Sequence, residues 1–339
     1  MMRKRLIIAF GLVVSAFFLW LTLRDQAWGE VAAAFGQADY RWLLPAALLI
    51  MVDYLIRGWR WQIILRPILS RPLPLGSSFS ILLLGFAANN VLPARAGELW
   101  RMWGLSQRAD VRKTVVLSTL VVERLFDGLT LLFLLALSGL LFPLQGQAQM
   151  VETALAALFG VVLLGLLAFL FFEDQMVRLA TLLMWPFPHE LRERLLGLID
   201  RFTDGLHALR RPRALLAIVF TSLLAWGSQA LSYAAILLAF GLRLDPLHLL
   251  GVATLMLALI NLLILIPAAP GNVGTYEGGG RLALSIAGIA ALRGETGTAI
   301  ILVSHMLQWL LVTAGGLIIA AQQGISLARV PSELSLAEE

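Results

Sequence analysis

Long apolar runs separated by short charged stretches make up most of the chain. The apolar runs extend over residues 6–23, 42–65, 76–92, 114–142, 151–172, 214–240, 247–266, 281–292 and 296–321. A helix of about 20 apolar residues is long enough to cross a bilayer, and most of the runs reach that length. The pattern therefore predicts an all-α polytopic membrane protein.

The positions of arginine and lysine indicate how these segments are oriented, because basic residues collect in cytoplasmic loops. Basic residues at 3–5 precede the first run, Arg66 and Arg71 follow the second, and the 101–113 stretch is basic as well. Two basic flanks around the 76–92 run predict a hairpin that enters and leaves on the cytoplasmic side. We expect a multi-pass protein of the cytoplasmic (inner) cell membrane with both termini in the cytoplasm.

Two segments interrupt the apolar pattern, and we call them the first break and the second break. The first break is Leu92–Glu98, with the sequence LPARAGE, and the second break is Ile266–Gly280. The second break contains two prolines and five glycines, through which we expect no helix to continue. The residues expected to interrupt the helices are Pro93, Gly97, Pro267, Pro270, Gly271 and Gly274.

The two breaks are similar in sequence. Each has an apolar residue, proline and alanine, then glycine and glutamate, and asparagine precedes each of them. The segments on either side of the second break are expected to form a second hairpin, which enters from the outside, opposite to the hairpin of the 76–92 run. This arrangement predicts an inverted repeat of two re-entrant broken helices, as in secondary transporters. Two unrelated proline-containing loops, with some of these segments spanning fully, stay an alternative.

The predicted segments form one transmembrane domain, residues 1–325, with about six full spans and two re-entrant hairpins. The charged 173–213 stretch is a cytoplasmic loop in this arrangement. Apolar residues recur at helical spacing between 191 and 209, which predicts an amphipathic helix along the lipid headgroups. Residues 326–339 are expected to form a short cytoplasmic tail.

Several ionisable residues fall inside the apolar runs, where each costs about 2.5–3.5 kcal/mol at the bilayer centre. Asp53, Arg57 and Arg60 are spaced to share one helix face, and so are Glu123 and Asp127. Because such charges need partners, we expect them to share a polar interior. The residues expected to line it and bind a substrate are Asp53, Arg57, Arg60, Arg95, Glu98, Arg101, Glu123, Arg124, Asp127, Glu277 and Arg281.

Two other interpretations of these charges stay open. Arg57 and Arg60 are near enough to a helix end for their long side chains to reach the cytoplasmic interface. The helix that carries Glu123 would, in the second interpretation, begin only near Leu129. Its charges would then lie at the cytoplasmic mouth of the protein and not within the membrane.

Taken in order, the motifs resemble those of a known family. They are Arg57-x-x-Arg60-Trp61, the first break with Glu98-x-x-Arg101, Glu123-Arg124-x-x-Asp127, and the Pro-Gly-x-x-Gly-x-x-Glu of the second break. This series is similar to the lysylphosphatidylglycerol synthase transmembrane family. The resemblance implies lipid translocation. It does not imply lysyl-lipid synthesis, because the chain stops at Glu339, where MprF-type members continue into an aminoacyl-transferase domain.

Composition excludes several classes of function. The chain has no cysteine, which excludes disulfides and thiolate metal sites. Its net charge of +5 accompanies 59% hydrophobic residues. We therefore attribute the basic excess to membrane topology and lipid headgroups and expect no nucleic acid. There is no Gly-Lys dipeptide and therefore no ATP-binding phosphate loop. The four histidines form no metal motif, and no G-x-S-x-G elbow occurs. We expect neither cofactor nor metal, and a packing role for His305.

These observations favour a transporter over an enzyme. Arginines suit a phosphate and carboxylates suit an amine or sugar hydroxyls, so we expect translocation of a phospholipid or lipid-linked headgroup without ATP. The alternatives are a membrane enzyme with Glu123 or Glu277 as base, or a non-transporting partner in an envelope-lipid pathway. The expected partner is the lipid substrate. A homo-oligomer and a separate lipid-modifying enzyme stay open.

Overall fold

The computed structural model describes residues 2–92, 96–109, 111, 113–141, 149–150, 172–186, 188–193, 195–197, 212–292 and 294–325, and a few residues between 153 and 169. Every regular element in this part of the chain is a helix. Four are long and apolar enough to cross a membrane: Tyr40–Leu65, Pro212–Ala239, Pro246–Ile264 and Gly294–Gln322. The prediction of an all-α polytopic membrane protein is confirmed, while the number of full spans stays a prediction.

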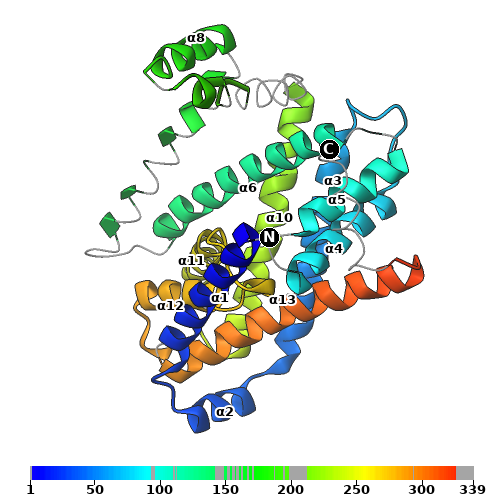
Figure 1. Cartoon of the computed structure of the whole chain (residues 1–339). Coiled ribbons are helices and arrows are strands. Elements are labelled where there is room, and N and C mark those ends of the chain that lie inside the picture. The colour runs from blue at the N-terminus through cyan, green and yellow to red at the C-terminus, as the bar shows by residue number, and fades with distance from the viewer. Residues whose placement is uncertain are drawn as a thin grey trace.

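Figure 1 shows the arrangement of the helices. In chain order the elements are α1 (Met2–Leu23), α2 (Trp28–Gln37), η1 (Tyr40–Trp42), α3 (Leu43–Leu65), α4 (Leu75–Val91), α5 (Ala96–Ala109), α6 (Lys113–Leu141), α8 (Glu173–Leu183), α10 (Pro212–Ala239), α11 (Pro246–Ile264), η2 (Pro270–Asn272), α12 (Thr275–Ala287), η3 (Ala290–Leu292) and α13 (Gly294–Gln322). The helices α1, α3, α4, α6, α10, α11 and α13 match predicted apolar runs within a few residues at each end.

No helix continues through the whole second break, because α11 ends at Ile264, but α12 begins within the break at Thr275 and contains three consecutive glycines. These glycines allow close packing. A Cβ atom on Gly279 would lie 2.6 Å from the Cα atom of Ile260 on α11, and one on Gly278 would lie 2.4 Å from the ring of Phe18 on α1. Tertiary packing thus outweighs the low helix propensity of glycine here.

The helices next to the two breaks form two hairpins that start and finish at opposite ends of the molecule. The α4–α5 hairpin lies at the end of α3, where Leu65 and Leu105 share an apolar cluster. The α11–α12 hairpin lies at the start of α3, because the Asp39 backbone N–H donates to the Ala239 carbonyl at 2.8 Å. The depth of either break in a bilayer stays a prediction.

The second break also packs against the helix that leads into the first break. The contact joins the turn η2 to the helix α4. The Asn90 side-chain amide donates to the Thr313 hydroxyl of α13 at 3.0 Å, and α13 packs along α4 as well. The largest apolar core surrounds this contact region on one side and combines residues of α6, α10, α11, α12 and α13.

The charged 173–213 stretch differs from the rest of the chain. Its described helix α8 has no buried residue and lies apart from the packed helices, at the opposite end from α2 (Figure 1). Much of the amphipathic pattern predicted between 191 and 209 falls outside the described residues, as do Pro93, Arg95 and the 326–339 tail. The short α2 was not predicted, because its ten residues are flanked by charges and contain two glycines.

Candidate functional site

Three charged residues lie on one face of α3, as their spacing predicts. The Arg57 Nε atom donates to the Asp53 carboxylate at 2.7 Å, and Arg60 Nη1 lies 2.8 Å from Asp127 Oδ1 on α6. Asp53 and Arg60 are 1% and 0% exposed, so the side chains do not reach an aqueous interface. The interpretation of Arg57 and Arg60 as residues that reach outward is not supported by this geometry.

The carboxylate of Glu123 completes the group. Arg101 of α5 binds it through both guanidinium ends, with Nη1 at 2.9 Å from Oε1 and Nη2 at 2.6 Å from Oε2. Glu123 is 1% exposed. Because α6 begins at Lys113 and not near Leu129, Glu123 lies within the helix and not in a segment before its start. We call the following six buried residues the ionic network: Asp53, Arg57, Arg60, Arg101, Glu123 and Asp127.

Tryptophans surround the ionic network. The Arg101 guanidinium lies 4.4 Å from the ring centre of Trp61, and the Arg57 guanidinium lies 4.2 Å from that of Trp226 on α10. The Trp226 indole N–H also donates to Asp127 at 2.9 Å. Cation–π contacts of this kind hold an arginine without consuming its hydrogen-bond donors. The donors therefore remain directed at carboxylates or at an incoming acceptor.

The ionic network keeps unused hydrogen-bonding capacity. Within the described residues, Arg60 Nε and Nη2, Arg101 Nε and Asp127 Oδ2 are buried without a hydrogen-bond partner. A buried polar atom in this state costs about 1–3 kcal/mol unless water or a ligand satisfies it. The network is thus suited to accept an additional polar group.

One ion pair lies at the edge of the ionic network. Arg124 Nη2 and Glu98 Oε1 are 3.0 Å apart, and their side chains are 43% and 32% exposed. Arg124 also approaches Asp127 at 4.0 Å, which connects the pair to the buried residues. We call Arg124 and Glu98 the edge pair. It is more exposed than the residues of the ionic network.

A second polar cluster holds the second break. His305 of α13 places Nδ1 2.6 Å from Glu277 Oε1 and Nε2 2.8 Å from the Gly271 carbonyl. The other oxygen of Glu277 accepts the Gly274 N–H at 2.6 Å, and this bond caps α12. Tyr276 stacks on the His305 ring at 4.1 Å between centroids. We call Glu277 and His305 the Glu–His pair. Besides packing against Tyr276, both ring nitrogens of His305 have a polar partner.

The remaining predicted residue on α12 has a different neighbour. Arg281 Nη1 donates to the Thr22 carbonyl of α1 at 2.7 Å, so it fastens α1 to α12. Pro270 begins η2, and Gly271 and Gly274 have φ angles of 72° and 92°. These positive φ values favour glycine. The turn of the second break thus brings the Gly271 carbonyl within hydrogen-bond distance of His305.

The α10 helix connects the two clusters through residues that were not predicted. Ser222 accepts from Arg60 at 2.9 Å, Trp226 binds Asp127, and the Tyr233 hydroxyl is 2.7 Å from that of Tyr276. Gln229 lies between them and has a buried carbonyl oxygen without a partner. The signal was present in the sequence, since the positions 222, 226, 229 and 233 recur at helical spacing within an apolar run. We call these four residues the α10 polar stripe.

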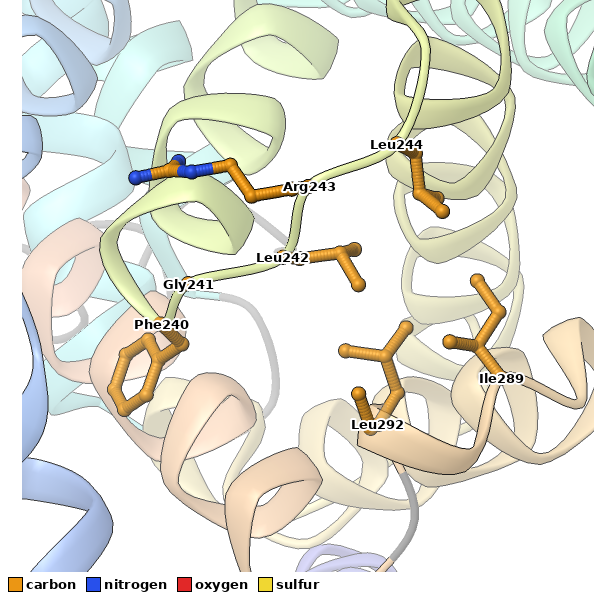
Figure 2. Close-up of a pocket in the computed structure, with 8 residues that line it drawn as sticks. Phe240, Gly241, Leu242, Arg243, Leu244, Ile289 and Leu292 are labelled. Atoms are coloured by element: carbon orange, nitrogen blue, oxygen red, sulfur yellow. The ribbon is translucent and has the colours of Figure 1, made fainter.

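A separate apolar hollow of about 340 Å³ lies at the end of the molecule where α10 joins α11. Leu242, Ile289 and Leu292 turn toward one another across it, whereas the Arg243 guanidinium points away (Figure 2). Its lining shares no residue with the ionic network or the Glu–His pair. It is therefore suited to a hydrocarbon group and does not serve as the charged site.

Comparisons with known proteins identify relatives in archaea. The chain is 28% identical over 299 residues to "Glycosyltransferase AglD" of Haloferax volcanii, which covers 81% of this chain and 48% of that protein. It is 22% identical over 306 residues to "UPF0104 membrane protein PH1989" of Pyrococcus horikoshii, 81% of this chain and 85% of that protein. A third relative, "UPF0104 membrane protein MJ1595" of Methanocaldococcus jannaschii, is 26% identical over 124 residues, 36% of this chain and 37% of that protein.

The chain thus spans about half the length of the Haloferax protein. No solved structure matches it significantly. A family model described as "Lysylphosphatidylglycerol synthase TM region" matches residues 8–316, which include most of α1, the ionic network, both breaks and most of α13. The chain belongs to the lysylphosphatidylglycerol synthase TM region family.

Proposed function

We propose that this chain moves a lipid or lipid-linked headgroup across the membrane and that the headgroup carries a phosphate. The observation that carries the proposal is the ionic network, with unpaired arginine N–H groups buried among apolar helices. Arginine N–H groups bind phosphate oxygens with favourable geometry. Membership of the family supports the same class of function.

The arrangement of the breaks supports a transport pathway. Each break follows a helix that lies near the polar residues, and η2 of the second break packs against α4, the helix that leads into the first break. In secondary transporters, such paired broken helices place substrate sites near the bilayer midplane. We infer that the edge pair receives the headgroup first and that the ionic network then binds it. The lipid tails would remain in hydrocarbon throughout.

The name of the Haloferax relative favours a sugar-bearing lipid among the cargoes to test. This chain matches 48% of that protein. The described residues contain no group of three or more His, Asp or Glu side chains suited to a metal. Because the buried arginine N–H groups of the ionic network suit the phosphate of a headgroup, we propose transport as the activity of this chain.

The test is lipid translocation by the purified protein in liposomes. Fluorescent phosphatidylglycerol and a fluorescent lipid-linked sugar phosphate serve as probes, and an added quencher reports the fraction in the outer leaflet. We expect Arg124→Met to slow translocation at least tenfold, since a lost charge-assisted hydrogen bond is worth about 1.5–3 kcal/mol. Folding should be preserved, because the edge pair is half-exposed.

Arg24, which directly follows α1, provides a matched control for Arg124. Arg24 pairs with Asp25 at 2.9 Å and is 42% exposed, nearly the same as Arg124 in its pair with Glu98. Arg24→Met should leave translocation unchanged. Equal translocation by the Arg124→Met variant and the wild type would remove the edge pair from the pathway, and no translocation of any probe by the wild type would contradict the proposed function.

A further inference from the structure

The Glu–His pair holds a proton whose position the geometry defines. The Gly271 carbonyl can only accept a hydrogen bond, so His305 Nε2 carries a hydrogen and donates to it. Both ring nitrogens of His305 face an oxygen, which fixes the ring orientation. The 2.6 Å contact between Nδ1 and Glu277 Oε1 then requires one further proton, because neither a bare nitrogen nor a carboxylate oxygen donates.

That proton can reside on either partner without changing the contacts. In one form an imidazolium faces a carboxylate, and in the other a neutral imidazole accepts from a carboxylic acid. Both forms have zero net charge. When the proton leaves, a carboxylate faces the lone pair of Nδ1 at the same distance, and the two repel. The proton therefore holds α13 to α12 and to the turn of the second break.

We infer that the Glu–His pair is a proton-binding site that couples headgroup movement to proton movement by releasing the second break when its proton leaves. The inference rests on the proposed function, to which it adds an energy source. Its structural basis is local. His305 bridges three elements at once, and the turn that it holds has left-handed backbone at Gly271 and Asn272, with φ angles of 72° and 58°.

The groups that face the pair set its proton balance. Tyr276 of α12 stacks on His305, and Tyr233 of α10 bonds to Tyr276. Tyr54 of α3 is the next titratable group in this direction, followed by Asp53. From α4, the facing residue is Asn90, which binds Thr313 and does not titrate. On α12 itself, the Arg281 guanidinium donates to the Thr22 carbonyl of α1 and not to the Glu–His pair.

The α10 polar stripe offers a route from this site to the ionic network. Tyr233 contacts Tyr276 at one end, and Trp226 contacts Asp127 at the other. Gln229 lies between them with a buried and unpartnered carbonyl oxygen. The first and last of the four positions are 11 residues apart, or about 16 Å along the helix. The α10 polar stripe thus places polar side chains between the ionic network and the Glu–His pair, along which an occupied headgroup site acts on the pair in this proposal.

The first experiment reads the proton directly at the second break and does not require transport. The chain lacks cysteine, so Val273→Cys places a single thiol in the turn. Its maleimide labelling rate in detergent is measured across pH and normalised to the same protein after unfolding in dodecyl sulfate, which removes the pH dependence of the thiol itself. We expect the normalised rate to rise with pH by up to about tenfold per pH unit, as the loss of one proton dictates.

Two variants remove the shared proton while keeping polar side chains. His305→Gln and Glu277→Gln, each combined with Val273→Cys, should abolish the pH dependence of labelling. Thr313→Val is the matched control, because it removes a hydrogen bond of α13 that carries no titratable group. It should retain the pH dependence. A wild-type rate that is flat with pH, or a His305→Gln rate that still rises, would overturn the proton-binding site.

The second experiment measures coupling in liposomes that contain the fluorescent phosphatidylglycerol probe. A pH gradient of one unit should change the rate or the final distribution of the probe in the wild type, and reversing the gradient should reverse the sign of the change. In His305→Gln the response should be lost. Transport that ignores the gradient in the wild type would overturn the coupling while leaving the proposed function intact. Absent transport with pH-dependent labelling would contradict the proposed function alone.

Discussion

The first and second breaks have similar sequences, but their glycine N–H groups are capped by different side chains. In the first, the Gly97 N–H is bound by Asn89 of the preceding helix at 2.8 Å, and Glu98 is left half-exposed in the edge pair. In the second, the Gly274 N–H is bound by Glu277 of the following helix at 2.6 Å, and this glutamate is buried against His305. A neutral amide caps one helix and a carboxylate caps the other.

This difference separates two tasks. Because an amide caps the first break, its glutamate is free to pair with an arginine that faces the outside of the cluster. At the second break the glutamate is committed to the backbone and to a histidine, where it holds a proton. We interpret the first break as the headgroup side and the second as the proton side, and the following predictions test that division in order of decreasing effect.

The largest effect is expected from Glu123→Gln, which removes the partner of Arg101 in the ionic network. An arginine left buried without its carboxylate costs about 3–5 kcal/mol, so the thermal unfolding midpoint in detergent should fall strongly. Glu98→Gln in the edge pair is the comparison and should cost less than about 1 kcal/mol. Equal midpoints for the two variants would mean that the ionic network is hydrated and that the buried and edge positions do not differ.

The next effect is steric and concerns the first break. A Cβ atom on Gly97 would lie 1.8 Å from the Gly85 carbonyl oxygen on α4, so Gly97→Ala must separate α4 from α5. We expect a loss of stability of about 1–3 kcal/mol or more, measured by denaturant or thermal unfolding in detergent. Gly128→Ala on α6 is the control, since nothing lies within 4 Å of its added Cβ atom. It should be neutral or stabilising.

Gly274→Ala tests the corresponding position of the second break. Its added Cβ atom would lie 2.4 Å from the Ser15 carbonyl oxygen of α1, and the φ angle of 92° disfavours alanine in addition. The expected damage includes the attachment of α1, so proteolysis of the α1–α2 connection should accelerate. Gly97→Ala should leave that connection resistant. The same cleavage pattern in both variants would show that the breaks are not mechanically distinct.

A smaller effect is expected from Asn89→Ala, which removes the cap of the first break. The lost bond to the Gly97 N–H should cost about 1 kcal/mol, visible as a modest decrease of the unfolding midpoint. The pH dependence of Val273→Cys labelling should persist in this variant, because the Glu–His pair is intact. A loss of that pH dependence would show that proton binding is distributed over both breaks.

The smallest effect belongs to Thr313→Val, which removes the bond between α13 and Asn90. Hydrogen bonds of this kind contribute about 0.5–1.5 kcal/mol, and the variant conserves shape. Translocation should continue at a reduced response to the pH gradient, because α13 is then fastened less firmly to the first break. An unchanged response would place the coupling entirely in the α10 polar stripe.

The sequence predicted the elements whose signal is local. Apolar runs located most helices, and the spacing of Asp53, Arg57 and Arg60 placed them on one face. The apolar run 281–292 located only the last part of α12, because its start at Thr275 lies among glycines that propensity disfavours and that close contacts with Ile260 and Phe18 stabilise. Periodicity also did not predict the partner of Glu277, since His305 follows it by 28 residues and meets it only when α12 folds back against α13.

The partner choices within the ionic network were likewise beyond local pattern. Arg124 lies three residues from Asp127 on the same helix, whereas its shorter contact is with Glu98 on α5. Arg101 and Glu123 lie on different helices, and only the packing of α5 against α6 brings them together. The polar residues of α10 recur at helical spacing. Because serine, tryptophan, glutamine and tyrosine are common in apolar helices, this spacing alone did not predict a functional site.

The attachment of α13 to both breaks has a thermodynamic consequence. Thr313 binds the first break's helix and His305 binds the second break, eight residues apart on the same rigid helix. Linkage then requires reciprocity: if an occupied headgroup site changes the affinity for a proton by some factor, protonation changes the affinity for the headgroup by the same factor. A titration of either ligand at two fixed levels of the other therefore measures one free energy twice.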